Sequence, residues 1–325
     1  MLQVAGFLIC LGLLAWCLRT AFDERNRAQL ERLADADASQ VAGLLSLSLV
    51  VVLISGEVFR NVLYPVRRLG LLSIHSTNAI ASLLALLPFK LSIVARVLVH
   101  NRRDGLPLLT ITAWFAAVSA VMACAIAPLL AVSRLRQPTD AVSVWLMLTS
   151  LLLAAGSMLL FARWLLTPRG WSLVTSIYAL LPKPKRLRAD APAGAALLDS
   201  ARQGCFMLAS PRAVLVSLLL RGLDVGVQGA RILVAAHIIG LDLSFDRAML
   251  AGLAYFLVGA AAPSGQLGAR ETAVTLLLGP EFAVVPLLIT AAETLVLVAG
   301  SVLGIAYLRP DRLLRLAKNP APASV

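Results

Sequence analysis

Long apolar stretches alternate with short polar or charged segments along the whole chain. A helix needs about 20 mostly apolar residues to cross a hydrocarbon core about 30 Å thick, and these stretches reach or approach that length. The pattern predicts spans over residues 2–18, 41–64, 69–87, 106–132, 141–166, 213–239 and 287–308. Residues 248–286 are also apolar but contain Pro and Gly, so we expect an interrupted element there. The predicted fold is an all-α, polytopic integral membrane helix bundle of about seven to nine transmembrane or re-entrant helices with Pro/Gly-broken segments.

The composition agrees with lipid as the surrounding solvent. Of the 325 residues, 59% are hydrophobic and 14% are charged, and the mean hydropathy is +0.86, whereas soluble domains are about 45–50% apolar. The formal charge of +12 comes from 29 Lys and Arg that gather between the apolar stretches. This distribution is typical of the positive-inside rule, so we expect no nucleic-acid partner. We expect the four Cys to be reduced and the first helix to be retained.

A polar segment, residues 167–211, separates two helical halves. Its stretch 182–188 combines prolines with like charges, which oppose a packed helix. We expect a single transmembrane domain over residues 1–325, made of an N-terminal half (1–166), a basic cytoplasmic loop (167–211), a C-terminal half (212–308) and a basic tail (309–325).

The charges of the loops predict the orientation, because each Lys or Arg resists transfer across an energised membrane. We expect the loop 167–211, residues 19–40, residues 90–103 and the tail to lie in the cytoplasm. The residues that would then lie on the opposite side are Arg60, Arg67, Arg68, Arg134 and Arg136. The stretch 182–188 is either a topology signal only or also a contact for anionic headgroups.

Polar residues recur within the predicted span 213–239, at steps of four, three, four and three. They are Ser217, Arg221, Asp224, Gln228 and Arg231, and at 100° per residue they share one stripe of a helix. Charged side chains near the middle of a bilayer normally face a cavity or a partner. Arg221 and Asp224 can pair, which leaves Arg231 as an unneutralised cation for an anionic ligand. The alternative is a structural ion pair, with Arg231 reaching the interface.

A second polar feature, residues 263–271, interrupts apolar sequence with one Pro, two Gly and two charged residues. A helix must break there, and irregular backbone at membrane depth is tolerated only against protein or water. We therefore expect this segment to line a cavity, with a new helix beginning near residue 269. The free amides at the start of that helix and the adjacent Arg270 favour an anion. The alternative is an ordinary interfacial turn.

The first half contains a looser counterpart of this feature. Pro88 should end or kink the third span, and Arg96 follows it. Interrupted apolar segments in both halves indicate a binding site between them, although no residue-level repeat is evident. Glu293, inside the last span, can pair with Arg231 or Arg270, titrate during transport or make a simple structural bond.

Residues 263–271 resemble the signature of the lysylphosphatidylglycerol synthase transmembrane-region family, also described as flippase-like membrane proteins. Members typically show a Pro, a Gly-rich turn and a Gly-x-x-Glu. The positions that match here are Pro263, Gly265, Gly268 and Glu271, while Gln266 replaces a usual Gly. The resemblance extends over about residues 41–308. It is weaker in the first half, where Ser92 replaces a common acidic residue and Trp114 lies near an expected Arg.

The resemblance implies a lipid-handling domain of the bacterial inner (plasma) membrane. Some relatives translocate an aminoacylated phospholipid, and others are linked to isoprenoid or hopanoid lipids. The aminoacyl-transfer domain of full-length synthases has no counterpart in the sequence, so we expect no lipid aminoacylation by this chain alone.

The sequence thus favours a flippase-like protein that binds, and translocates, an anionic or polyprenyl/aminoacyl lipid headgroup. The alternatives are an intramembrane lipid-modifying enzyme and a non-transporting partner of a lipid-biosynthesis enzyme. We expect no catalytic residue, metal site or cofactor, because no catalytic or metal-binding motif is evident. The residues expected to contact the headgroup are Arg221, Asp224, Gln228, Arg231, Pro263, Ser264, Gly265, Gly268, Arg270, Glu271 and Glu293.

Overall fold

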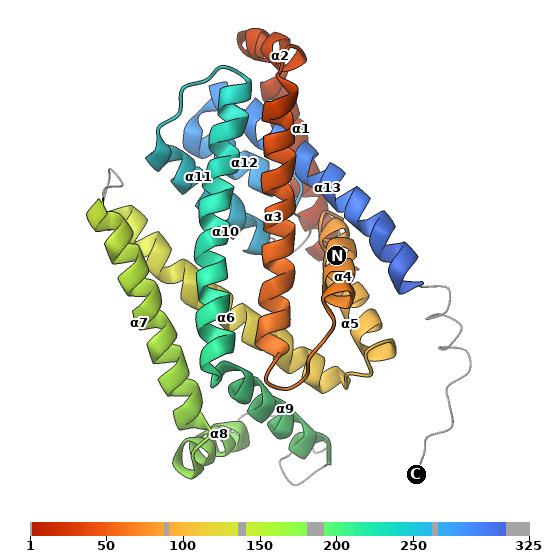
Figure 1. The fold of residues 1–325 in the computed structure, drawn as a ribbon, viewed down its shortest axis with the longest axis vertical. Helices are drawn as coiled ribbons and strands as arrows, with labels where there is room; N and C mark the ends of the chain where they lie inside the picture. The colour runs from red at the N-terminus through yellow and green to blue at the C-terminus, as the bar shows by residue number, and fades with distance from the viewer. Residues whose placement is uncertain (1, 88–90, 136–140, 181–191, 262–265, 310–325) are drawn as a thin grey trace.

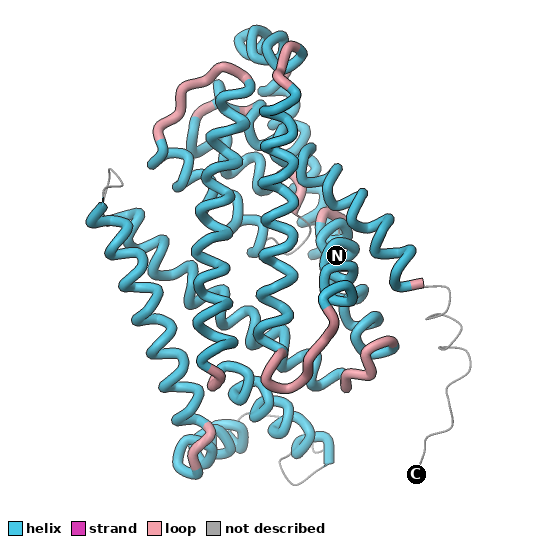
Figure 2. Tube along the Cα trace, viewed as in Figure 1, coloured by secondary structure: helices cyan, strands magenta, loops and turns pink. Residues whose placement is uncertain are grey.

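The computed structural model describes residues 2–87, 91–135, 141–180, 192–261 and 266–309, and within these ranges the chain forms helices and loops only (Figures 1 and 2). The helices are α1 (Leu2–Ala21), η1 (Glu24–Asn26), α2 (Arg27–Ala34), α3 (Ala38–Leu63), α4 (Leu71–Ala85), α5 (Leu91–Arg102), α6 (Leu108–Leu135), α7 (Ala141–Leu165), α8 (Pro168–Leu180), α9 (Pro192–Leu208), α10 (Pro211–Ile238), α11 (Phe245–Ala261), α12 (Ala269–Leu278), η3 (Pro280–Phe282) and α13 (Val284–Leu308). Six of the described helical segments are long and apolar enough to cross a bilayer. The predicted all-α membrane bundle is confirmed.

Helices α3 and α10 run antiparallel through the length of the bundle and define its two ends (Figure 1). At one end, here called the α2 end, Arg32 Nη1 donates to the carbonyl of Gly240 at 2.9 Å. At the other, the α9 end, the guanidinium of Arg212 lies 4.4 Å from the centre of the Tyr64 ring. A 26-residue helix such as α3 is about 39 Å long, so it separates the two ends by more than the thickness of a hydrocarbon core.

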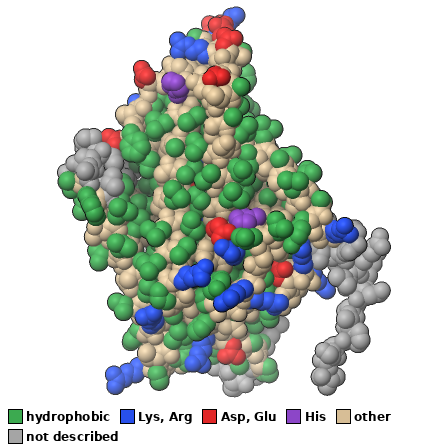
Figure 3. All heavy atoms as spheres, in the orientation of Figure 1, with side chains coloured by type: hydrophobic (Ala, Val, Ile, Leu, Met, Phe, Trp, Pro, Cys, Tyr) green, Lys and Arg blue, Asp and Glu red, His purple; other side chains and the backbone are tan. Residues whose placement is uncertain are grey.

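This arrangement corrects the predicted orientation of two segments. Residues 19–40 lie at the α2 end, opposite the α8 and α9 helices of the 167–211 segment, whereas we expected both on one side (Figure 1). Arg60, Arg67 and Arg68 lie at the α9 end together with that segment, not across from it. The basic side chains of the visible face therefore gather toward the α9 end, and a hydrophobic band covers its middle (Figure 3).

The α4–α5 pair is a re-entrant hairpin, so the predicted span 69–87 is wrong. Helix α4 has 15 residues, about 22 Å, which is too short to cross. The chain returns through α5 to the α9 end, where the hydroxyl of Ser73, near the start of α4, donates to Asp104 just after α5 at 3.3 Å. Pro88, which we expected to end the third span, lies outside the described residues.

The α11–α12 pair forms a second hairpin, which enters from the α2 end. Arg247, near the start of α11, donates through Nη2 to the carbonyl of Leu278 at the end of α12, at 2.7 Å. The two helices therefore begin and end at the same side of the bundle. The interrupted element expected over residues 248–286 is thus re-entrant, and the two hairpins enter the bundle from opposite ends.

The segment 167–211 contains two helices, α8 and α9, that we did not predict. Both begin with a proline, Pro168 and Pro192, which suits the first turn of a helix because its missing N–H has no partner to lose there. Helix α9 packs against α6, where Ser200 Oγ donates to the carbonyl of Leu109 at 2.6 Å. The basic stretch 182–188 and the tail beyond residue 309 lie outside the described residues.

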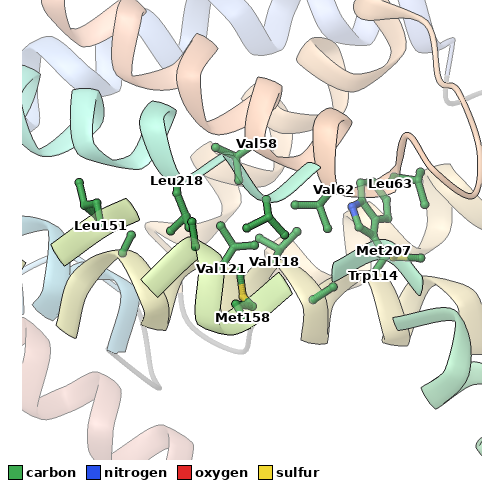
Figure 4. Packing of buried hydrophobic residues seen from close by; sticks show 14 of the residues in the cluster. Val58, Val62, Leu63, Trp114, Val118, Val121, Leu151, Met158, Met207 and Leu218 are labelled. Atoms are coloured by element: carbon green, nitrogen blue, oxygen red, sulfur yellow. The ribbon is translucent and has the colours of Figure 1, made fainter. Parts of the chain in front are cut away.

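A hydrophobic core joins α3, α6, α7, α9 and α10 next to the α4–α5 hairpin (Figure 4). Trp114 is its largest fully buried side chain, and its Nε1 donates to the carbonyl of Phe59 at 2.9 Å. The Trp114 ring also meets Phe59 and His100 edge to face, at 5.6 and 4.9 Å between ring centres. Trp114 therefore ties α3 and α5 to α6 and carries no charge into the core.

The long helices also have defined starts. Asp37 caps α3, and the hydroxyl and amide of Ser39 donate to its carboxylate at 2.6 and 3.3 Å. These hydrogen bonds hold the pKa of Asp37 below its ordinary value, because they stabilise the charged form.

Candidate functional site between the two hairpins

A cavity of about 380 Å³ lies between the N-terminal and C-terminal halves of the chain. Helices α3 to α6 line one side and α10 to α13 the other, so both re-entrant hairpins reach it. Its volume lies within the range of about 300–1,000 Å³ that is usual for small-molecule sites. The charged side chains that line it are Arg96, Arg221, Asp224, Arg270 and Glu293.

The cavity lies near the middle of the bundle, away from both ends. Asp224 stands close to the centre of α10 (Pro211–Ile238), and Ser55 lies well inside α3 (Ala38–Leu63). Ile93 on α5 and Ser119 on α6 line the cavity and are exposed. The cavity is therefore open at the side that α5 and α6 form.

Glu293 on α13 binds two arginines from different helices. Its Oε2 accepts from Arg231 Nη2 on α10 at 3.0 Å, and its Oε1 accepts from Arg270 Nη1 on α12 at 3.1 Å. Both guanidiniums are buried. The expected pairing of Glu293 with either arginine is thus realised with both, and this carboxylate connects α10, α12 and α13.

Arg231 is not the unneutralised cation that we expected. Its side chain has no exposed surface, and besides Glu293 it donates to Gln228 Oε1 at 2.8 Å and to the carbonyl of Ile289 at 3.3 Å. The error arose because the partner of Arg231 stands 62 positions away in the chain, beyond the reach of any local spacing. Arg231 lies behind the cavity wall and positions Glu293 and Gln228, which do line the cavity.

The predicted pair of Arg221 and Asp224 is present, with Arg221 Nη1 at 2.8 Å from Asp224 Oδ2. Both side chains are almost fully buried. Several polar atoms near the cavity nevertheless have no hydrogen-bond partner, namely Asp224 Oδ1, Arg221 Nε, and Nε and Nη2 of Arg270. Buried polar groups in folded proteins are nearly always paired, so these atoms are available to hydrogen-bond a polar group in the cavity.

Gly268 and Glu271 shape the beginning of α12 and do not line the cavity. Gly268 has a φ of 86°, a conformation that favours glycine, and its N–H donates to Glu271 Oε2 at 2.6 Å. The other carboxylate oxygen of Glu271 accepts from the hydroxyl of Thr290 on α13. The Gly-x-x-Glu therefore fixes the start of α12 against α13. Arg270, which lies within it directly before Glu271, reaches Glu293.

Arg270 crosses the face of α11 at a glycine. A Cβ built on Gly259 would stand 2.7 Å from Arg270 Cδ, which is closer than two non-bonded carbon atoms approach in proteins. The guanidinium of Arg270 also lies 4.5 Å from the centre of the Tyr255 ring. The α11–α12 hairpin thus holds Arg270 between Gly259 and Tyr255. Pro263, Ser264 and Gly265, which we expected at the site, lie outside the described residues.

Arg96 was not among the predicted site residues, yet it is the charged group that the first half contributes to the cavity. Its Nη2 donates to Asn78 Oδ1 at 2.6 Å, and its guanidinium lies 4.1 Å from the centre of the Phe59 ring. Among the described residues it has no carboxylate partner. The available signal was Arg96, an Arg surrounded by apolar residues in the first half of α5.

Of the other predicted residues, one lies in the cavity wall and one lies outside it. Gln228 lines the cavity with Arg221 and Asp224, and Ser217 is buried on the same helix outside the lining set, with its hydroxyl unpaired. The geometry thus brings most of the predicted polar groups to one cavity. Binding of a lipid headgroup there remains a prediction.

The sequence model of the family described as the lysylphosphatidylglycerol synthase TM region matches residues 3–281. No curated protein and no solved structure gave a significant match to the chain. The match covers most of the chain, including both hairpins and every charged lining residue except Glu293. With the six long apolar helices, it identifies a multi-pass integral membrane protein related to lipid handling.

Proposed function

The chain belongs to the family of the lysylphosphatidylglycerol synthase transmembrane region, and on that premise we propose that it binds a lipid headgroup in the cavity between its hairpins and carries it across the bilayer. The observation that supports this proposal most strongly is a cavity near the middle of the apolar bundle with five charged side chains in its wall. Charged groups are expensive at that depth and are retained where they serve a function.

The side opening of the cavity suits a lipid. A phospholipid needs a polar site for its headgroup and an apolar route for its tails. Since Ile93 on α5 and Ser119 on α6 line the cavity and are exposed, the tails of a bound lipid can stay in the surrounding bilayer. A soluble ligand would have no need of such an opening.

The opposed hairpins suit exchange between two leaflets. The α4–α5 hairpin closes the cavity toward the α9 end, and the α11–α12 hairpin closes it toward the α2 end. Movement of one hairpin against the fixed pair α3 and α10 would open the site to one side at a time, which is the alternating access found where broken helices meet at a midplane site.

We also propose that the α9 end faces the cytoplasm. The described basic residues at that end include Arg60, Arg67, Arg68, Arg169 and Arg212 and outnumber its acidic residues, such as Glu57 and Asp104. The α2 end mixes both signs of charge, as in the ion pairs of Arg25 with Asp23 and Arg27 with Glu31. The positive-inside rule then places the α9 end inside, in the plasma membrane of the cell. The proposal needs no covalent bond to form or break, so we propose no enzymatic activity. Association with a lipid-biosynthesis enzyme stays a prediction.

The proposal is tested with the protein in vesicles that carry a fluorescent phospholipid, where a membrane-impermeant quencher reports which headgroups reach the outer leaflet. Ser92 lines the cavity, and Ser157 lies exposed on α7, away from it. We expect Ser92→Phe to abolish headgroup exchange by filling the cavity and Ser157→Phe to leave it unchanged. Exchange by a folded Ser92→Phe protein at the wild-type rate would refute the proposal.

A further inference from the structure

We propose that the cavity selects lipids by headgroup charge: it takes a headgroup of net negative charge on Arg96 and excludes a net positive, lysyl-type aminoacyl headgroup. This inference rests on the proposed function, because it names the class of lipid that the same site takes. It departs from the substrate in the name of the family.

The charges around the cavity do not cancel. Over the described residues, the cluster contains four arginines, namely Arg96, Arg221, Arg231 and Arg270, and three carboxylates, namely Asp224, Glu271 and Glu293. Four positive charges against three negative ones leave one positive charge. The lining residues alone give the same result, with three arginines against two carboxylates.

The carboxylates of the cluster are already engaged. Glu293 binds two guanidiniums, and Glu271 accepts from Gly268 and Thr290 behind the wall. Asp224 pairs with Arg221 and keeps one oxygen without a partner. That oxygen can accept a headgroup hydroxyl, but its charge is already matched, so no carboxylate remains to balance an ammonium group.

Arg96 carries the surplus charge. Its partners in the structure are neutral, the amide oxygen of Asn78 and the ring of Phe59, and Arg221, which lines the same cavity, carries a charge of the same sign. The amide of Asn78 is itself anchored, because its Nδ2 donates to the carbonyl of Val52 at 2.8 Å. Arg96 is therefore held in place as a donor while its charge is not balanced, and a phosphate beside it would neutralise the cluster.

A lysyl headgroup would have the opposite effect. Phosphatidylglycerol carries one negative charge, whereas esterification with lysine adds two ammonium groups and makes the headgroup net positive. Placing it in the cavity would raise the charge of the site in a region of low dielectric constant, where like charges repel strongly. Phosphatidylglycerol would bring the total charge to zero.

The inference is tested by headgroup exchange in vesicles with trace amounts of fluorescent phosphatidylglycerol, phosphatidylcholine or lysylphosphatidylglycerol in otherwise identical lipid. We expect the fastest exchange for phosphatidylglycerol and background exchange for the lysyl lipid. Arg96→Gln should slow phosphatidylglycerol exchange by about ten- to hundredfold, the usual worth of a charge-assisted hydrogen bond. Arg102→Gln, an exposed position on the same helix, should have no effect, and Arg96→Lys should restore most of the rate.

Reversing the charge at position 96 keeps the test decisive if Arg96→Gln slows lipid exchange only because that variant folds poorly. Arg96→Glu should exchange the lysyl lipid faster than phosphatidylglycerol. Equal rates for the two lipids in the wild type, or an unchanged ratio in Arg96→Gln, would overturn the inference while leaving the proposed function intact.

A binding measurement distinguishes failure of the proposed transport function from failure of the proposed charge preference. If the wild type exchanges no lipid at all, the proposed function fails, and native mass spectrometry of the protein with phosphatidylglycerol and with the lysyl lipid then decides the charge preference alone. Inorganic phosphate in excess distinguishes a lipid from a free anion. We expect it to leave bound phosphatidylglycerol in place, and its complete displacement by phosphate would overturn the assignment of a lipid ligand.

Discussion

Replacement of Glu293 by Gln is the perturbation that the structure predicts most sharply. Glu293 neutralises Arg231 and Arg270 from two other helices, at 3.0 and 3.1 Å. The amide of Gln keeps the shape and can still accept a hydrogen bond, but it removes the only negative charge that contacts either guanidinium among the described residues. The variant therefore isolates the charge of this residue from its packing.

The expected loss of stability is large because both cations are buried. Removal of one partner from a buried ion pair costs about 3–5 kcal/mol, since the remaining charge stays without compensation. Arg231 has no exposed surface, and the side chain of Arg270 is 5% exposed, so bulk water screens neither charge. We expect Glu293→Gln to lower the free energy of unfolding by about 3–5 kcal/mol.

Unfolding in mixed micelles, titrated with a denaturing detergent and followed by circular dichroism, measures this quantity. Glu31→Gln is the control, because Glu31 pairs with Arg27 on α2 while both side chains are more than 60% exposed. Exposed pairs of this kind contribute about 0–0.5 kcal/mol. If the two variants lose the same small amount, the reasoning from burial and charge is refuted.

A double-mutant cycle tests the pairing itself. Arg270→Gln should cost less in the Glu293→Gln background than in the wild type, because its partner is already gone. The difference should be about 0.5–3 kcal/mol, as for residues in direct contact. Strict additivity would mean that the Arg270–Glu293 contact contributes nothing.

Three further predictions concern the elements around the cavity. Gly268→Ala should lower the free energy of unfolding by about 1–3 kcal/mol, because Gly268 has a positive φ. Gly12→Ala, on a face of α1 with open space, should be neutral or slightly stabilising. Equal effects of the two substitutions would contradict backbone strain at position 268. In a background without native cysteines, Glu24→Cys and Arg202→Cys should react with an impermeant thiol reagent from opposite sides of the membrane, and labelling from one side would disprove the arrangement of the two ends. The cap at Asp37 should stabilise α3 at neutral pH and lose this effect as the pH falls through its lowered pKa, so the stability advantage over Asp37→Ala should shrink in acid; a difference independent of pH would exclude the charged cap.

The sequence was sufficient for the long helices and for local pairs. Apolar length alone predicts α3, α6, α7 and α10 to within a few residues, because a bilayer demands about 20 apolar residues whatever their order. The pair of Arg221 and Asp224 was predictable because residues three apart on a helix are neighbours.

The hairpin in the first half was not predictable in the same way. An apolar run of 15 residues such as α4 resembles a short span, and only its contact with α5 through Ser73 and Asp104 reveals that the chain turns back. The helices α8 and α9 were missed because the segment 167–211 is polar overall, although α9 packs on α6 and α8 packs on α7.

The charge balance of the site depended on distant pairs. Arg231 and Glu293 are far apart in the chain, so the sequence could offer a pairing between them only as one option. Glu293 neutralises Arg231. Of the described arginines around the cavity, the one without a carboxylate partner is therefore Arg96, in the N-terminal half. The polar stripe on α10 was enough to locate the cavity. The sign of the net charge around the cavity depends on ion pairs between helices and could be read only from the whole bundle.

The most direct test of a headgroup site is the position of phosphorus in the protein in phosphatidylglycerol nanodiscs, determined by electron cryomicroscopy with a bound antibody fragment. We predict a phosphate density in the cavity, within hydrogen-bonding distance of the Arg96 guanidinium and absent in Arg96→Gln. Phosphate density only at the two membrane surfaces, with water alone between the hairpins, would contradict the account.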